Sequence, residues 1–160
     1  MKILWAPWRM KYVTAPHKTA GETCLFCRAA SGDDREYYIV YRSSKSYIML
    51  NKYPYNTGHL MVVPYKHVDT LLKLDDDELL DLFKTLNKAL EILEKAFRPD
   101  GFNIGVNIGR DAGAGIEEHV HIHVVPRWRG DTNFMPIVGG VKVLPQLLEE
   151  TYELLLKNLK

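Results

Sequence analysis

A long run of leucines with helical spacing is the feature that most constrains the fold of this chain. Over residues 75–97 the apolar side chains return every three or four positions, which is the repeat of one face of an α-helix. Asp75, Asp76 and Asp77 open the run and place negative charge where the helix dipole favours it. Arg98-Pro99-Asp100-Gly101 ends it. The sequence therefore predicts one long helix in the middle of the chain.

Short β-branched and aromatic runs flank this helix and predict strands. We expect strands at 37–41, 47–50, 59–64, 102–108 and 118–125, with the first two forming a hairpin. Pro64 and Pro126 are expected to end the third and fifth strands. A second apolar periodicity predicts a C-terminal helix over 143–159, whereas 14–36 is expected to be mostly loop. This order of elements predicts an α+β fold with an antiparallel sheet.

Composition and charge narrow the classes of function. The 160 residues are about one domain's worth, and the net charge of +1 gives no global field for a nucleic-acid polymer or a membrane surface. No apolar run reaches the roughly eighteen residues of a membrane span. Residues 1–12 lack the apolar core of a signal peptide. We therefore expect a cytoplasmic protein whose anionic ligands are bound by local groups.

Three histidines alternate along the last predicted strand, in the run His119-Val120-His121-Ile122-His123. Side chains alternate between the faces of a strand, so the three imidazoles are expected on one face and the apolar residues toward the core. A row of this kind is compatible with a polar surface, with a zinc or iron site, or with nucleophilic catalysis. The choice between these alternatives depends on the neighbouring segments.

The neighbouring segments favour catalysis on a phosphate. The loop Ala112-Gly113-Ala114-Gly115 can bring backbone N–H groups close to phosphate oxygens. Asn103 and Asn107 lie four residues apart on the preceding strand and offer uncharged amide donors on one face. Histidine attacks phosphorus and forms a covalent intermediate at neutral pH. We therefore favour histidine nucleophilic chemistry over a polar face.

Two motifs then match a known family. The run from His119 to Val125 resembles the H-φ-H-φ-H-φ-φ signature of the histidine triad (HIT) family of nucleotide hydrolases and transferases. Gly58-His59-Leu60-Met61-Val62-Val63-Pro64 resembles the second marker of the same family. Segments 4–10, 126–128, 130–131 and 133–134 look like the bacterial branch that includes diadenosine tetraphosphate phosphorylases and hydrolases.

The resemblance covers nearly the whole chain and implies its organisation. It implies a single HIT domain over 1–160, with an N-terminal extension and CxxC loop at 1–36, a core at 37–128, and a C-terminal extension and helix at 129–160. It further implies a five-stranded antiparallel sheet and a homodimer in which two sheets become continuous. The implied activity is cleavage of dinucleoside polyphosphates or nucleoside phosphoramidates, with water or phosphate as acceptor. The alternative is a catalytically weak nucleotide-binding or signalling module.

The resemblance also implies roles for four histidines. His121 would attack the α-phosphate and become nucleotidylated. His119 and His123 would flank it, holding phosphate oxygens or aiding the leaving group. His59 would lie behind His121 and orient it.

Five further residues are implied substrate contacts. Asn103 and Asn107 would face the phosphates, and Asn51 would contact ribose hydroxyls or else serve as a turn residue. Trp128 would contact substrate or else belong to the core. Gly115 departs from the family, because many relatives carry glutamine or serine there, so its backbone N–H would have to substitute for a side chain.

Cys24 and Cys27 form the chain's one C-x-x-C pair. In a reducing compartment such a pair is typical of a metal site or a disulfide-exchange motif, although no thioredoxin-like βαβ pattern surrounds this one. The resemblance implies a structural zinc ion completed by His67 and His119. The alternative for His67 is a solvent-exposed loop histidine. No organic cofactor is implied.

Overall fold

The computed structural model describes residues 24–132 and 144–159. A five-stranded antiparallel sheet has the strand order β1-β2-β3-β5-β4. Its strands are β1 (Ile39–Arg42), β2 (Ser46–Leu50), β3 (Leu60–Pro64), β4 (Gly101–Val106) and β5 (Ile122–Arg127). The helices are α2 (Leu25–Ser31), α3 (Asp76–Phe97) and α5 (Leu148–Lys157), with short 3-10 turns at Leu71–Lys73 and Arg110–Ala112. The predicted α+β fold is confirmed.

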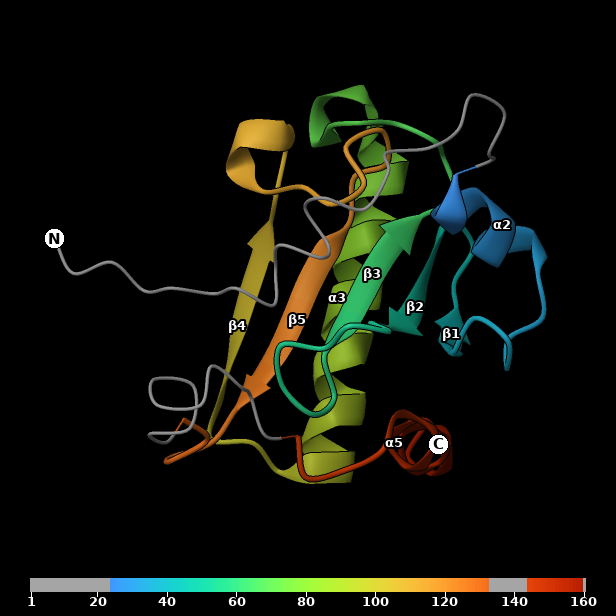
Figure 1. Cartoon of the computed structure of the whole chain (residues 1–160). Helices are drawn as coiled ribbons and strands as arrows, with labels where there is room; N and C mark the ends of the chain where they lie inside the picture. The colour runs from blue at the N-terminus through green and yellow to red at the C-terminus, as the bar shows by residue number, and fades with distance from the viewer. Residues whose placement is uncertain (1–23, 133–143, 160) are drawn as a thin grey trace, which may run out of the picture.

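Helix α3 lies behind the sheet and forms the main core with it (Figure 1). Asp75 caps the helix through a capping box with Glu78, in which each side chain accepts a hydrogen bond from the other residue's backbone N–H. Arg98 ends it in the left-handed conformation, with φ 46°. The predicted helix over 75–97 is thus confirmed, with Asp75 as its cap.

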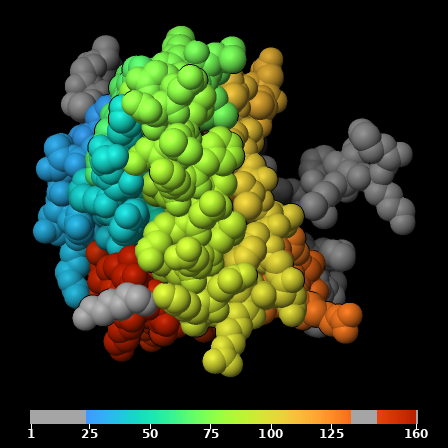
Figure 2. Space-filling model, turned by 180° about the vertical axis from the view of Figure 1, so that it is seen from behind, coloured from blue at the N-terminus to red at the C-terminus, as the bar shows by residue number. Residues whose placement is uncertain are grey.

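The two faces of the sheet carry different layers. Figure 2 shows α3 covering the rear face, with α5 beside its lower end. Alternate strand residues such as Ile48, Val62 and Val124 point into this rear core. On the opposite face, Tyr47 and Met61 pack with α2 in a second cluster. His123 pairs with Met61 in the ladder, so it belongs to the face that α2 partly covers.

Helix α2 is a correction, because residues 14–36 were expected to be mostly loop and Leu25–Ser31 is helical. Phe26 and Ala29 are three residues apart and both buried, so the helix is held by packing. Its C-terminal carbonyls are capped from a distance: the Arg42 guanidinium donates to the carbonyl oxygens of Ala29, Ala30 and Gly32. A local sequence pattern does not reveal a cap supplied by another element.

The last strand is a second correction. It begins at Ile122 rather than at 118, because the backbone N–H of Val120 donates to the Val68 carbonyl (2.7 Å) and not to a strand neighbour. It also continues through Pro126 to Arg127. Strand β3 pairs with β5 only as far as Val124, so beyond that residue one side of β5 has no neighbouring strand. Proline, which has no backbone N–H to donate, is therefore tolerated at position 126.

Other helix and strand boundaries in the structure differ from the predicted ones by a few residues. Strand β1 begins at Ile39 instead of 37, and β4 occupies Gly101–Val106 instead of 102–108. The C-terminal helix is Leu148–Lys157 instead of 143–159: residues 144–147 are described and are not helical, and residue 143 lies outside the described residues. Trp5, Trp8 and the segment 133–134 also lie outside the described residues. Within the described ranges, every helix is too short or too polar to cross a bilayer.

Candidate active site and metal centre

His121 is presented just before β5 and is held by a backbone hydrogen bond. Its Nδ1 lies 3.0 Å from the carbonyl oxygen of His119. A carbonyl oxygen only accepts, so Nδ1 carries the proton and donates. The other ring nitrogen, Nε2, therefore keeps its lone pair. His121 is 5% exposed, so burial and this hydrogen bond together hold its unprotonated nitrogen in one orientation.

His123 has the opposite tautomer, set by a chain of hydrogen bonds. The backbone N–H of Tyr55 donates to His59 Nδ1 (3.1 Å), so the proton of His59 is on Nε2. That Nε2–H donates to His123 Nδ1 at 2.9 Å. His123 therefore carries its proton on Nε2 and is a hydrogen-bond donor. The expectation that His59 orients His121 is wrong, since its hydrogen bond is to His123.

The loop before His59 depends on Gly58. Its φ of +75° lies in the left-handed region, where glycine is favoured. A Cβ there would approach Leu93 and Phe97 to 3.2 Å and Pro126 to 3.3 Å. Glycine thus lets the loop pack onto the end of α3 while delivering His59, which gives the Gly-His marker a physical reason.

Burial keeps these imidazoles neutral. Desolvation, reinforced by the neighbouring rings, lowers the pKa of His59 to about 3. Desolvation, with a smaller contribution from His121, lowers the pKa of His123 to about 4. Burial also lowers the pKa of His121. At neutral pH the site therefore offers one unprotonated nitrogen, on His121, beside one N–H donor, on His123.

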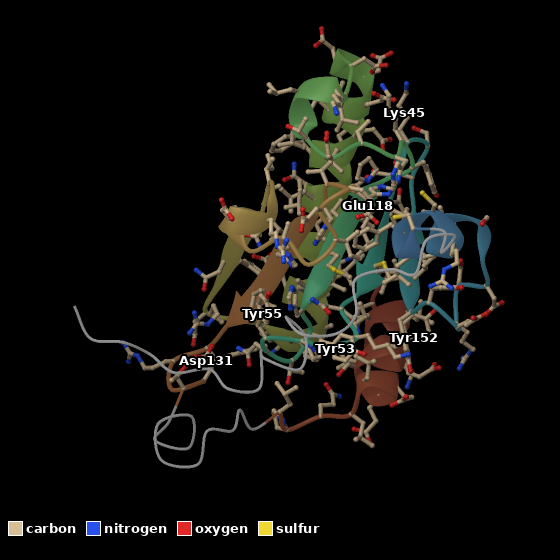
Figure 3. All side chains as sticks on the ribbon, turned by 45° about the horizontal axis from the view of Figure 1, so that its top comes forward. Lys45, Tyr53, Tyr55, Glu118, Asp131 and Tyr152 are labelled. Atoms are coloured by element: carbon tan, nitrogen blue, oxygen red, sulfur yellow. The ribbon has the colours of Figure 1, made fainter. Side chains whose placement is uncertain are left out.

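The two histidines lie in a row of aromatic rings. Phe26 packs on His121 with ring centroids 4.7 Å apart, and His121 is 4.7 Å from His123. Tyr55 stacks on His123 at 5.9 Å. Figure 3 shows Tyr55 beside β5. Neither Phe26 nor Tyr55 was predicted as a site residue from the sequence; the one available signal was their closeness in sequence to Cys24, Cys27 and His59.

Asn103 is on the histidine side of the sheet, and Asn107 follows the same strand. Asn103 pairs with Val125 in the ladder and Gly105 pairs with His123, which places Asn103 on the same face as His123. The Asn103 Oδ1 accepts a hydrogen bond from Arg127 (2.7 Å). Asn107 follows β4, and its amide reaches the Gly113 carbonyl at 3.5 Å. Asn107 therefore supports the glycine-rich loop.

The other predicted contacts have varied surroundings. Asn51 accepts from the Tyr53 backbone N–H (2.9 Å), as a turn residue does, and its amide also lies 3.4 Å from His59 Nδ1. Gly115 is exposed in the loop that precedes the histidines. Trp128 packs on Phe97 at the end of α3, with centroids 6.4 Å apart, so its ring serves packing on the side opposite the histidines.

His119 does not share the surface of the other two histidines. Its Nε2–H donates to the Pro64 carbonyl (2.9 Å), which leaves Nδ1 unprotonated. That Nδ1 is 3.4 Å from Cys24 Sγ, 3.7 Å from Cys27 Sγ and 3.3 Å from His67 Nδ1. The expectation of three imidazoles on one face is therefore corrected: His119 turns toward the cysteines because it precedes the regular strand.

The four donors fit a tetrahedral zinc ion. The ligand atoms all lie within 4.8 Å of one another. Ordinary Zn–N and Zn–S bond lengths imply tetrahedral edges of roughly 3.3–3.8 Å. The N···S and N···N contacts, between 3.3 and 3.7 Å, agree with those edges. The Pro64 carbonyl also fixes the tautomer of His119, as outer partners of zinc-bound histidines do.

An ion held by the three triad histidines does not fit this geometry. His121 Nδ1 is occupied by a backbone carbonyl and His123 Nδ1 by His59. Within the part of the chain that the structure describes, the Cys24, Cys27, His67 and His119 group is the one cluster suited to a metal. The row of histidines therefore divides into the neighbouring pair His121 and His123, and His119, which belongs to the cluster suited to a metal.

Comparison with known proteins identifies the family. The HIT domain family model matches residues 34–130, so the chain belongs to the histidine triad family. A protein named AP-4-A phosphorylase, from Mycobacterium tuberculosis, is 45% identical over 161 residues, covering 97% of this chain and 83% of that protein. The asymmetrical bis(5'-nucleosyl)-tetraphosphatase of Schizosaccharomyces pombe is 38% identical over 93 residues, covering 58% of this chain and 50% of that protein.

A solved structure bears on the metal cluster. A zinc-bound histidine triad family protein from Mycobacterium smegmatis matches this structure with a TM-score of 0.70 and 27% identity, over 86% of this chain and 93% of that one. The fold that carries the cluster is thus shared with a protein that holds zinc.

The lowered histidine pKa values predict a loss of stability in acid. Unfolded histidine has a pKa near 6.5, whereas folded His59 and His123 titrate at about 3 and 4. Below pH 6.5 the unfolded chain binds protons that the folded chain does not, so the free energy of unfolding falls as pH falls toward 3. Each group contributes up to about 1.4 kcal/mol per pH unit. Urea unfolding of the wild type and His59→Gln at several pH values measures this, and the variant should show the shallower dependence. Equal slopes would contradict the assignment.

The donor geometry also predicts where zinc binds. Metal analysis of the purified chain should find about one zinc per chain. Cys27→Ala and His67→Ala should each lower that content, because each removes one ligand. His121→Ala is the matched control and should retain zinc. Zinc that survives the first two substitutions but is lost from the control would place the metal on the triad instead.

Proposed function

We propose that this protein cleaves dinucleoside polyphosphates at the α-phosphate through a nucleotidyl-His121 intermediate. The observation that carries the proposal is the pair of opposite tautomers: His121 offers a lone pair on Nε2 while His123, next to it, offers an N–H. A nucleophile beside a donor is what displacement at phosphorus needs, because negative charge grows on the leaving oxygen.

In the first step, His121 Nε2 attacks the α-phosphorus, and the bond to the bridging oxygen breaks. The electron pair leaves with that oxygen as a polyphosphate anion, stabilised by the N–H of His123. The nucleotidylated ring of His121 becomes cationic while Nδ1–H still donates to the His119 carbonyl. That carbonyl is a preformed acceptor for the charge that develops on the ring.

In the second step, an acceptor attacks the same phosphorus and the electron pair of the P–N bond returns to His121. We propose inorganic phosphate as this acceptor, which makes the product a nucleoside diphosphate. His123 Nε2 already carries a proton, so it cannot act as the general base that an attacking water molecule would need. Inorganic phosphate is an anion and can attack without such a base. The likeness to a protein named AP-4-A phosphorylase supports the same acceptor. The likeness to a bis(5'-nucleosyl)-tetraphosphatase supports the substrate class.

Several further assignments belong to this proposal. Asn51 contacts ribose, Asn103 faces the substrate, and Asn107 with the Gly115 backbone N–H supports the phosphates. Zinc, when bound, is structural: Cys24, Cys27, His67 and His119 hold it, and it supplies no chemistry to either step. Through them α2 is tied to the segment that carries His121.

We further propose a cytoplasmic homodimer. Strand β4 is an edge strand, and a free edge invites pairing with a second chain. Ile104 on that strand is 48% exposed, and Leu80 and Phe83 on α3 are 55% and 52% exposed. Figure 2 shows α3 and the β4 segment adjoining on the same face. Pairing of two β4 edges would join the sheets and cover these apolar side chains.

The catalytic proposal is tested with diadenosine tetraphosphate, with and without inorganic phosphate, and with product identification. Phosphate should yield ADP and ATP, whereas a water acceptor would yield AMP and ATP. His121→Ala should lower kcat by roughly 10⁴-fold or more, because the nucleophile is lost. Circular dichroism should be unchanged in that variant.

Two results would contradict the proposal. Unchanged turnover in His121→Ala would exclude it as the nucleophile. Tight adenosine monophosphate binding without any cleavage by the wild type would favour the nucleotide-binding module instead. Adenosine phosphoramidate, assayed in parallel, separates the two substrate classes.

The dimer is tested by light scattering after gel filtration. The wild type should have twice the 18.4 kDa chain mass. Ile104→Lys and Phe83→Glu should shift it to the monomer, because each places a charge in an apolar contact. Leu72→Glu, at a 93% exposed site on the 3-10 turn after β3, is the matched control and should stay dimeric. A monomeric wild type would overturn the assembly.

A further inference from the structure

A pocket of about 290 Å³ opens next to His123, on the histidine side of the sheet. It is lined by the loop between β2 and β3 and by the adjacent strands β4 and β5, through Tyr55, Asn56, Asn103, Val125 and Arg127. Whole small-molecule sites usually measure about 300–1,000 Å³. The pocket therefore has room for one part of a dinucleotide. Of the residues that line it, the function proposed above uses only Asn103.

Tyr55 forms one wall of this pocket. Its side chain is 51% exposed although its ring stacks on His123 with an interplanar angle of 29°. Its backbone N–H is fixed by the bond to His59, and the next residue, Asn56, is buried and donates to the Pro126 carbonyl (3.0 Å). The aromatic face is thus held in place by the same loop that sets the histidine tautomers.

Arg127 forms another wall, and its charge is already paired. The guanidinium donates to both carboxylate oxygens of Asp131 at 2.6 and 2.9 Å, and to Asn103 Oδ1 at 2.7 Å. Figure 3 shows Asp131 in the loop that follows β5. A fixed, neutralised guanidinium attracts a phosphate weakly, yet its plane stacks well on an aromatic base. The pocket therefore suits a flat, uncharged ring.

The leaving group of the proposed reaction departs toward this pocket. His121, His123, Val125 and Arg127 follow one another along one face of the chain, and four strand residues from His123 to Arg127 span about 13 Å. In-line displacement sends the leaving oxygen away from the attacking nitrogen of His121. The leaving half of the substrate therefore passes His123 and extends toward Tyr55 and Arg127.

We propose that this pocket is a subsite for the base of the leaving nucleoside, stacked on Tyr55 and facing the Arg127 guanidinium. The inference rests on the proposed function, because it names the part of a dinucleoside polyphosphate that departs. It makes Tyr55 a specificity residue, selecting a substrate that carries a second nucleoside.

The test compares diadenosine tetraphosphate with adenosine 5'-tetraphosphate, which lacks the second nucleoside and ends in a free phosphate. Binding is measured by calorimetry in the His121→Ala background, where neither ligand is consumed. This background should prefer the dinucleotide by about tenfold, the usual value of one stacked base. Tyr55→Ala should abolish the preference, and Tyr55→Phe should keep it. Tyr53→Ala, two residues away and 69% exposed, is the matched control and should also keep it.

The outcomes separate the possible errors. A preference that survives Tyr55→Ala, or no preference in the His121→Ala background, overturns the subsite. Equal weakening of both ligands by Tyr55→Ala also overturns the subsite. That result would mean that Tyr55 only holds His59 and His123 in place and does not contact the second nucleoside. If the binding pattern is as expected but the wild type cleaves neither ligand, the subsite is supported and the proposed function is overturned.

Discussion

The hydrogen bond from His121 Nδ1 to the His119 carbonyl is the contact on which the rest of the site depends. It fixes which nitrogen of His121 is unprotonated, and it is made by the backbone of a residue whose side chain belongs to the metal cluster. The segment that carries both residues lies outside the regular ladder. Its position is therefore set by contacts with α2 and β3 and by the backbone hydrogen bond from Val120 to Val68, and the unprotonated nitrogen of His121 is only as well placed as those contacts.

The sheet organises everything else around this contact. Its rear face is sealed by α3, so the opposite face is free to carry polar side chains without weakening the core. On that face α2 covers one side of the histidines and the loop after β2 covers the other. The result is a row of rings from Phe26 to Tyr55, in which each imidazole has an aromatic neighbour and a defined tautomer.

Much of this was predictable from periodicity and spacing. The long helix and the strands follow from patterns local in sequence, such as the leucine repeat, and the nucleotide chemistry follows from the resemblance of the histidine run and the Gly-His marker to a known family. What local patterns missed depends on distant partners. Helix α2 needs Arg42 to cap it, the turn of His119 away from the strand needs the Val68 carbonyl, and the partner of His59 is decided by the Tyr55 backbone. Tyr55 itself reads as an ordinary loop residue until the sheet brings it against His123.

The four residues of the cysteine–histidine cluster are spread along the chain, and this has a consequence for folding kinetics. Cys24 and His119 are 95 residues apart, and Cys27 and His67 are 40 apart. Contacts between residues so far apart close large loops and form slowly compared with local ones. We expect α3, a local element with its own cap, to form early, and the cluster to assemble only after β3 and β5 have paired. The active site would then be among the last parts of the molecule to take shape, and a chain still emerging from the ribosome would lack it until β5 had been synthesised.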